Sequence, residues 1–316
     1  PTLLIKLHQR IAFAHREDAG VIIDARLSYR KYGQFLLIIG KQPILDGHQG
    51  QSAVKKEGRH VAQAGFNGHE LGLAEVGGRC VVAKARLIFP GSHAKIILDD
   101  ADLSSSLLSA LAVCFHAGQG CALNTRLLVP RDKQAEVEEL LKTYFGFITY
   151  GDPSSESEIM GPQVNARQRE RVLAYIEKGK QEGARVLLGG GTPDNLDKGY
   201  YVEPTVFVDV TNDMTIAQEE IFGPVLCVIA HDGDDDAVRI ANDSYFGLSG
   251  SVWSASEERA LAVARRIRTG TINVNGGNFY GADAPLGGYK QSGIGREMGL
   301  EGFEEYLETK TIAIAV

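Results

Sequence analysis

The chain has 316 residues, of which 44% are hydrophobic and 23% charged, so it is long enough to form two globular domains. Its net charge of −7 gives no general attraction to nucleic acid, and we expect no nucleic-acid partner. No apolar run approaches the roughly 18 residues that a membrane-spanning helix needs, so we expect no membrane partner either.

Charge is unevenly distributed along the chain. Residues 1–90 hold 13 Lys and Arg against 7 Asp and Glu, whereas the remainder holds 20 against 33. The basic front has no dense Lys/Arg run, so we interpret the break as two segments of different origin or selection rather than as a nucleic-acid arm. The four cysteines form no CxxC pair, which is typical of a reducing compartment and predicts a cytoplasmic protein.

Apolar runs predict the elements in chain order. In the front segment they predict strands at 21–23, 35–39 and 81–89. A strand at 94–98 follows, and then a helix that Asp99-Asp100 is expected to cap and Gly118 to end. Beyond it, we expect strands at 126–129, 184–188, 201–208, 225–230, 248–253 and 271–274, with helices at about 132–144, 164–182, 234–243 and 256–268.

This alternation predicts an α/β domain around a largely parallel sheet. We expect that domain over residues 91–303, after an atypical segment at 1–90 and before a terminal strand at 304–316. The last residues alternate Thr309 and Thr311 with isoleucines, which indicates an exposed strand that needs a partner. The acidic run Asp232–Asp236 predicts a solvated helix start, and we expect no metal site.

Three sequence blocks indicate chemistry. Phe115–Cys121 reads FHAGQGC, Gln218–Val225 reads QEEIFGPV, and Pro285–Glu297 reads PLGGYKQSGIGRE. A lone cysteine is more often an inert buried residue than a nucleophile. Cys121, however, follows a helix end and two glycines, in a loop where backbone N–H groups can turn toward an incoming oxygen.

In this order and at these distances, the three blocks resemble the catalytic half of the aldehyde dehydrogenase family, from about Ala94 to Val316. The resemblance implies a small-molecule aldehyde as substrate and NAD or NADP as cofactor. It implies that the Cys121 thiolate attacks the aldehyde, that hydride passes to the cofactor, and that a Glu-activated water hydrolyses the thioester. It also implies a homodimer or homotetramer that pairs through Thr309–Val316.

Further roles follow from the resemblance residue by residue. Glu220 matches the family residue that holds the nicotinamide ribose hydroxyls, and Phe222 matches the aromatic residue near the nicotinamide ring. Glu297 matches a carboxylate near the thiol that is proposed as a proton relay. Without the resemblance, Glu220 and Glu297 read as surface carboxylates and Phe222 as ordinary core. Leu286 stands where Phe is commoner, which predicts a differently shaped aldehyde pocket.

Before Ala94 the resemblance stops, and residues 1–93 do not match the family. The general-base position is Ile88, which cannot activate water, and Pro90 replaces a glycine. The closest match to the cofactor-binding turn, Gly72–Gly77, lacks the hydroxyl residues. We therefore expect a truncated or atypical segment in place of a full Rossmann-like cofactor domain. We hypothesise truncation with a frameshifted or substituted front, which sequencing of the encoding DNA would test.

Three interpretations remain open at this stage. The chain is an NAD(P)-dependent aldehyde dehydrogenase, a catalytically impaired pseudoenzyme or oligomerisation scaffold of the same fold, or an esterase that uses Cys121 without hydride transfer. The motifs favour the first interpretation. The loss of the base at Ile88 favours the other two for this polypeptide.

Overall fold

The computed structural model describes residues 93–277 and 281–314 in full, and before them the backbones of five strands. The chain divides into two compact units, Pro1–Ala85 and Arg86–Val316, close to the division expected at residue 90. No helix in the described part is both long and apolar enough to cross a membrane.

The strands described in the first unit pair antiparallel. A three-stranded sheet has the order β1-β2-β3, and β4 pairs with β5 in a second sheet. The strands expected at 21–23 and 35–39 are confirmed, and of the strand expected at 81–89 only its first residue lies in β5. The bounds are β1 Leu7–Ile11, β2 Val21–Arg30, β3 Gln34–Pro43, β4 Ala74–Val76 and β5 Arg79–Val81.

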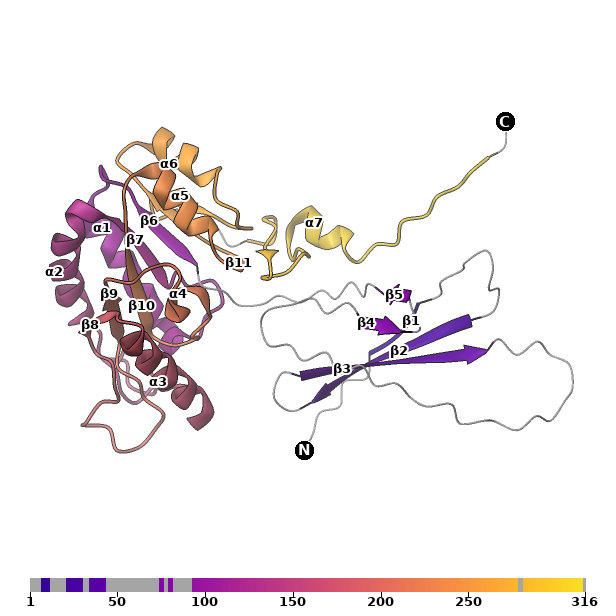
Figure 1. Ribbon diagram of the computed structural model, residues 1–316, viewed down its shortest axis with the longest axis horizontal. Helices are drawn as coiled ribbons and strands as arrows, with labels where there is room; N and C mark the ends of the chain where they lie inside the picture. The colour runs from indigo at the N-terminus through magenta and orange to yellow at the C-terminus, as the bar shows by residue number, and fades with distance from the viewer. Residues whose placement is uncertain are drawn as a thin grey trace, which may run out of the picture. The chain divides into compact units, whose positions relative to one another are not determined.

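A seven-stranded sheet forms the centre of the second unit (Figure 1). Its order is β13-β12-β6-β7-β10-β9-β8, and every pair is parallel except β8 with β9. The predicted α/β class with a largely parallel sheet is therefore confirmed. The bounds are β6 Ala94–Ile97, β7 Arg126–Pro130, β8 Arg185–Leu188, β9 Thr205–Val208, β10 Val225–His231, β12 Ser251–Trp253 and β13 Asn273–Val274. The strands β11 Phe246–Gly247 and β14 Tyr289–Lys290 pair separately.

Helices cover both faces of this sheet because its strands bury side chains alternately on the two sides. Leu127 and Val129 of β7 join the cluster that contains the helical residue Leu141, whereas Leu128 joins the cluster that contains Ile176. Burial of one such side chain stabilises the fold by about 1.5–3 kcal/mol. The helices are α1 Leu103–Leu108, the 3₁₀ helices Ser109–Gly118 and Arg131–Lys133, α2 Gln134–Phe145, α3 Ala166–Gln181, α4 Thr215–Gln218, α5 Asp234–Asn242, α6 Glu257–Ala264 and α7 Gly299–Glu304.

The first helix of the second unit differs from its prediction at both ends. Its N-cap is Asp102, whose side chain accepts a hydrogen bond from the Ser105 N–H, because Asp99 and Asp100 form ion pairs with Arg259 instead. The helix becomes 3₁₀ at Ser109 and loses helical geometry at residues 115–117, before Gly118. The chain therefore enters the predicted nucleophile block as an irregular turn.

The terminal strand expected at 304–316 is not formed within this chain. Residues 308–314 carry no regular secondary structure, and Ile312 and Ile314 are 78% and 85% exposed. A strand needs a hydrogen-bonded neighbour, and these residues have none among the described residues of the single chain. Pairing through Thr309–Val316 therefore stays a prediction.

Candidate active site

Cys121 lies in an exposed turn between the 3₁₀ helix and β7. Of the described cysteines, it alone is exposed, whereas Cys114 and Cys227 are buried. Burial raises the pKa of each of those two thiols to about 12, so both are inert at neutral pH. The side chain of Cys80 lies outside the described residues. Exposure therefore distinguishes the predicted nucleophile from the other described thiols.

The turn before Cys121 is held in an uncommon backbone conformation. His116 and Ala117 have positive φ values of 52° and 54°, which non-glycine residues seldom adopt. The side chain of Gln163 donates a 2.8 Å hydrogen bond to the Ala117 carbonyl, and that of Gln119 donates a 3.0 Å bond to the His116 carbonyl. These bonds offset part of the strain and define the path of the chain into Cys121.

Two glycines bring the first and second sequence blocks together. Gly118 has φ +73°, and a Cβ added to it would lie 2.0 Å from the carbonyl carbon of Gly223. The backbones therefore touch at a distance that only glycine permits. Gly118 is three residues before Cys121 and Gly223 directly follows Phe222, so the Cys121 turn lies beside the segment with Glu220 and Phe222.

Glu220 has an unusual environment for a carboxyl group. Burial raises its pKa to about 7, against the opposing effect of the Arg171 guanidinium. Arg171 donates its hydrogen bond to the Glu220 backbone carbonyl, at 2.7 Å, and the Glu220 carboxylate accepts none from the described residues. The neighbouring Glu219, by contrast, accepts a 2.7 Å bond from the Tyr175 hydroxyl. Glu220 is thus a partly buried carboxyl that is available to a ligand.

Phe222, two residues after Glu220, is held in an uncommon backbone conformation. Phe222 has φ +57°, and its carbonyl accepts a 2.8 Å hydrogen bond from the Gln168 side chain. Asn165 caps α3 by accepting from the Gln168 N–H, so the donor sits in the first turn of a capped helix. The conformation of the second block is therefore set by α3.

The structure does not join the third block to this site. Glu297 is exposed, and its backbone exchanges two 2.7 Å hydrogen bonds with Leu286. Among the described residues, no hydrogen bond or ion pair links Glu297 with Cys121. Lys290 has a structural role, because its ammonium donates to the carbonyl of Asn242, the last residue of α5, and to that of Ser244. Ile88 and Pro90 lie outside the described residues, and of Gly72–Gly77 only the strand β4 is described.

The site lies at the amino ends of the parallel strands. Cys121 precedes β7 and Phe222 precedes β10. The sequence analysis missed His93 and Ser249, which precede β6 and β12 at the same edge. The His93 imidazole contacts the Cys121 carbonyl at 2.8 Å, and the Ser249 hydroxyl donates to the Ala122 carbonyl at 2.9 Å. His93 directly precedes one predicted strand and Ser249 lies at the start of another, and these positions could have indicated that both residues lie at the same edge of the sheet as Cys121.

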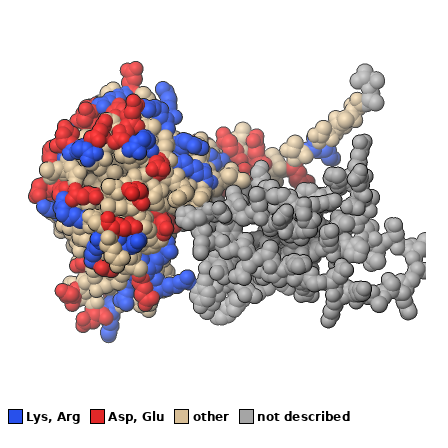
Figure 2. All heavy atoms as spheres, viewed as in Figure 1, with Lys and Arg blue, Asp and Glu red and all other residues tan. Residues whose placement is uncertain are grey.

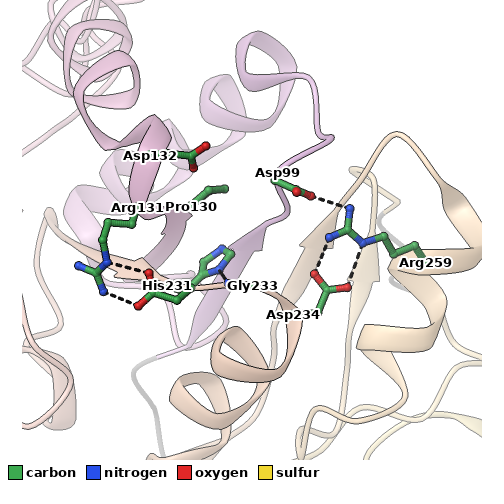
Figure 3. Close-up of a pocket in the computed structure, with 9 residues that line it drawn as sticks. Asp99, Pro130, Arg131, Asp132, His231, Gly233, Asp234 and Arg259 are labelled. Carbon is green, nitrogen blue, oxygen red and sulfur yellow. Dashed lines mark hydrogen bonds and ion pairs between the residues drawn. The ribbon is translucent and has the colours of Figure 1, made fainter.

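A cavity of about 420 Å³ lies at the opposite, carboxyl edge of the sheet (Figure 3). Ion pairs occupy both of its arginines: Arg131 pairs with Asp232 at 2.8 Å, and Arg259 pairs with Asp234 at 2.6 Å. It contains no thiol and none of the residues of the three blocks, so it is not the site of the predicted chemistry. Its lining consists of Asp99, Pro130, Arg131, Asp132, His231, Asp232, Gly233, Asp234 and Arg259.

A family model described as the aldehyde dehydrogenase family matches residues 66–312. The chain belongs to the aldehyde dehydrogenase family. The motif resemblance begins at about Ala94, whereas the match to the family model begins 28 residues earlier, at residue 66. The prediction that residues 1–93 do not match the family is therefore wrong from residue 66 onward, and the match includes the positions of Ile88 and Pro90.

Over the aligned residues, curated aldehyde dehydrogenases are 40–45% identical to the chain. A betaine aldehyde dehydrogenase of Rhizobium johnstonii is 40% identical over 294 residues, which is 90% of this chain and 58% of the relative. A 3-succinoylsemialdehyde-pyridine dehydrogenase of a Pseudomonas species is 45% identical over 233 residues, 73% of this chain and 49% of the relative. The chain thus spans about half the length of the curated relatives it matches.

Solved aldehyde dehydrogenase structures share the fold. An aldehyde dehydrogenase of Mycobacterium tuberculosis complexed with NAD+ has a TM-score of 0.68 and 45% identity, covering 70% of this chain and 46% of that one. A betaine aldehyde dehydrogenase of Staphylococcus aureus in complex with NAD+ has a TM-score of 0.69 and 39% identity, covering 71% and 45%. The matched part of this chain is therefore an aldehyde dehydrogenase fold.

On the face shown in Figure 2, acidic and basic side chains are interspersed over the described part of the second unit, without a continuous basic patch. Within the described residues, no three His, Cys, Asp or Glu side chains gather as a set of metal ligands.

Proposed function

We propose that this chain oxidises an aldehyde to a carboxylic acid with NAD or NADP, and that Cys121 is the nucleophile. One observation carries the proposal: the Gly118–Gly223 contact places an exposed thiol beside the segment that bears a partly buried, unpaired carboxyl. Membership in the aldehyde dehydrogenase family supports it, and so does the NAD+ bound in solved relatives.

The residues present fit a nicotinamide cofactor at Glu220. A carboxylate that accepts no hydrogen bond from the described residues can accept two from the adjacent hydroxyls of a ribose. Burial removes water from this carboxyl and raises its pKa to about 7, so new hydrogen bonds to its ionised form are favourable. Phe222, two residues further on, is proposed to supply an apolar surface for the nicotinamide ring, as the family resemblance implies. When bound, the nicotinamide supplies a hydride acceptor.

Cys121 performs the covalent steps. Its thiolate attacks the aldehyde carbonyl carbon, and the carbonyl oxygen becomes an oxyanion. The Cys121 N–H donates to no acceptor among the described residues, so it is available to that oxyanion. Loss of hydride from the carbon leaves a thioester on the sulfur. Water then breaks the carbon–sulfur bond, which releases the acid and restores the thiol.

We propose further that release of the acid is slow, because Ile88 stands at the general-base position. A positioned base contributes about 10²- to 10⁴-fold to such a step. The chain should therefore form one thioester per Cys121 quickly and hydrolyse it slowly. Glu297, which is exposed and bridged to Leu286, is proposed as the proton relay only on the strength of the family resemblance.

The test is the time course of NADH formation with betaine aldehyde and octanal as probes. We expect a burst of about one NADH per Cys121, followed by slow turnover. Cys121→Ala should abolish the burst, and Ile88→Glu should raise the turnover rate. If the wild type forms no NADH but cleaves p-nitrophenyl acetate through Cys121, the chain is an esterase without hydride transfer. If it shows neither activity, the chain is a catalytically impaired scaffold.

We also propose that the chain forms a homodimer or homotetramer through Thr309–Val316. The exposure of Ile312 and Ile314 supports this, because isolated edge segments with alternating apolar residues usually pair. Size-exclusion chromatography of a chain ending at Glu308 tests it, since the mass should fall to that of one chain. A reducing, cytoplasmic location is likewise proposed from the three free cysteines.

A further inference from the structure

His93 is buried at the amino end of β6 and bonded through both ring nitrogens. The residue is 2% exposed. Its Nδ1 is 3.4 Å from the backbone nitrogen of Ser249, and its Nε2 is 2.8 Å from the carbonyl oxygen of Cys121. A backbone N–H can only donate, so Nδ1 is the acceptor. The proton therefore resides on Nε2, which donates to Cys121.

Burial keeps this arrangement uncharged. It lowers the pKa of His93 to about 4, despite the hydrogen bond to Cys121, which acts in the opposite direction. Near neutral pH the ring is then a neutral imidazole with one tautomer. A second proton would displace the Ser249 N–H from Nδ1, so the neutral form alone satisfies both partners.

A second contact fixes the next peptide of the same turn. The Ser249 hydroxyl donates to the Ala122 carbonyl at 2.9 Å, and the Arg126 N–H donates to the His93 carbonyl at 2.9 Å. The strands that follow Ser249, His93 and Cys121 are the adjacent strands β12, β6 and β7. Two consecutive carbonyls, those of Cys121 and Ala122, thus tie the turn to the amino ends of β6 and β12.

We propose that His93 is a positioning residue, which holds the Cys121 carbonyl through Nε2–H and so fixes the orientation of the thiol toward its substrate. The inference rests on the proposed function, in which Cys121 is the nucleophile. A thiol held in a near-attack geometry reacts faster than one in a freely moving turn. A buried histidine that only filled the core would affect stability without affecting the reactivity of Cys121.

His231 provides a matched control at the opposite edge of the sheet (Figure 3). It is also 2% exposed, its Nε2 lies 2.9 Å from the Ile97 carbonyl oxygen, and its Nδ1 accepts from the Gly233 N–H at 3.3 Å. Replacement of His231 by Leu therefore removes an equivalent buried imidazole and equivalent hydrogen bonds, far from the Cys121 turn.

The experiment measures the rate constant for acylation of Cys121 by p-nitrophenyl acetate, from the burst of p-nitrophenolate, which requires no cofactor. We expect His93→Leu to lower it at least tenfold, and His231→Leu to leave it within about threefold. Urea unfolding should show similar destabilisation of both variants. Labelling by iodoacetamide should show that the thiol is still exposed. Equal acylation rates in His93→Leu and His231→Leu overturn the proposal.

Two conservative variants decide the matter if His93→Leu fails to fold. Gln places an amide N–H near the position of Nε2, whereas Asn places its amide near Nδ1. We expect His93→Gln to acylate within about threefold of the wild type and His93→Asn at least fivefold more slowly. The reverse order, or no difference, overturns the proposal. Absence of NADH formation by the wild type would refute aldehyde oxidation, but the comparison of acylation rates among the His93 variants would still test the role of His93, because acylation requires no cofactor.

Discussion

Gly118→Ala should destabilise the chain more than an alanine substitution at a glycine that has positive φ but open space around it. Alanine at φ +73° costs about 1–2 kcal/mol relative to an unstrained conformation. The added Cβ would also lie 2.0 Å from the Gly223 carbonyl carbon and 2.1 Å from its oxygen. Relief of that overlap requires a backbone shift, and overpacking of this kind costs about 1–3 kcal/mol more.

Gly183→Ala separates the two contributions. Gly183 follows α3 with φ +96°, and an added Cβ there would meet nothing within 4 Å. We therefore expect Gly183→Ala to lower the free energy of unfolding by about 1–2 kcal/mol. Gly118→Ala should lower it by about 2–5 kcal/mol, the sum of strain and overlap.

Urea unfolding followed by circular dichroism measures both free energies, and acylation of Cys121 by p-nitrophenyl acetate gives a second readout. Only Gly118→Ala should slow acylation, because only it moves the Cys121 turn away from the Phe222 segment. If the two variants lose the same stability and acylate equally fast, then the Gly118–Gly223 contact does not hold the site together.

Three further predictions follow from burial and charge. Under native conditions iodoacetamide should modify Cys121 and leave Cys114 and Cys227 unmodified, as peptide mass spectrometry would show; modification of either buried thiol at a similar rate would contradict the structure. The pKa of Glu220 is about 7 in the fold against its usual 4.5, so the fold loses stability as Glu220 ionises. Relative to Glu220→Gln, the wild type should lose up to about 3 kcal/mol of unfolding free energy between pH 4.5 and pH 7. A difference between the two proteins that stays constant with pH in urea unfolding would refute this. Arg126→Met should lower the free energy of unfolding by about 2–5 kcal/mol, because the buried guanidinium donates to the Ile240 and Ala241 carbonyls at the end of α5; an unchanged urea midpoint would show that those carbonyls find other donors.

The sequence predicted most of the second unit because its elements follow from local patterns. Apolar runs located the seven strands of the central sheet to within a few residues, apart from β9 and β12, which begin later than expected, whereas β11 was not predicted. The irregular geometry at Phe115–Ala117 could not be predicted, because no glycine or proline marks His116 or Ala117 and the supporting bond comes from Gln163. Local propensity was there overridden by a distant side chain.

Capping failed as a prediction for a related reason. Asp99 and Asp100 have the right chemistry for an N-cap, but both carboxylates form ion pairs with Arg259, which is distant in sequence. The site itself divides the same way. Contiguous motifs predict Cys121, Glu220 and Phe222 as candidate site residues, whereas the contact of His93 with the Cys121 turn depends on β6 and β7 being neighbours in the sheet.

The single tryptophan of the chain makes the second unit separately observable. Trp253 lies in β12, with the Lys95 ammonium nitrogen 4.4 Å from the centre of its ring. Its fluorescence emission therefore reports on the sheet that carries Cys121, and no tryptophan signal arises from residues 1–85. A change in that emission therefore reports on the second unit within the intact chain.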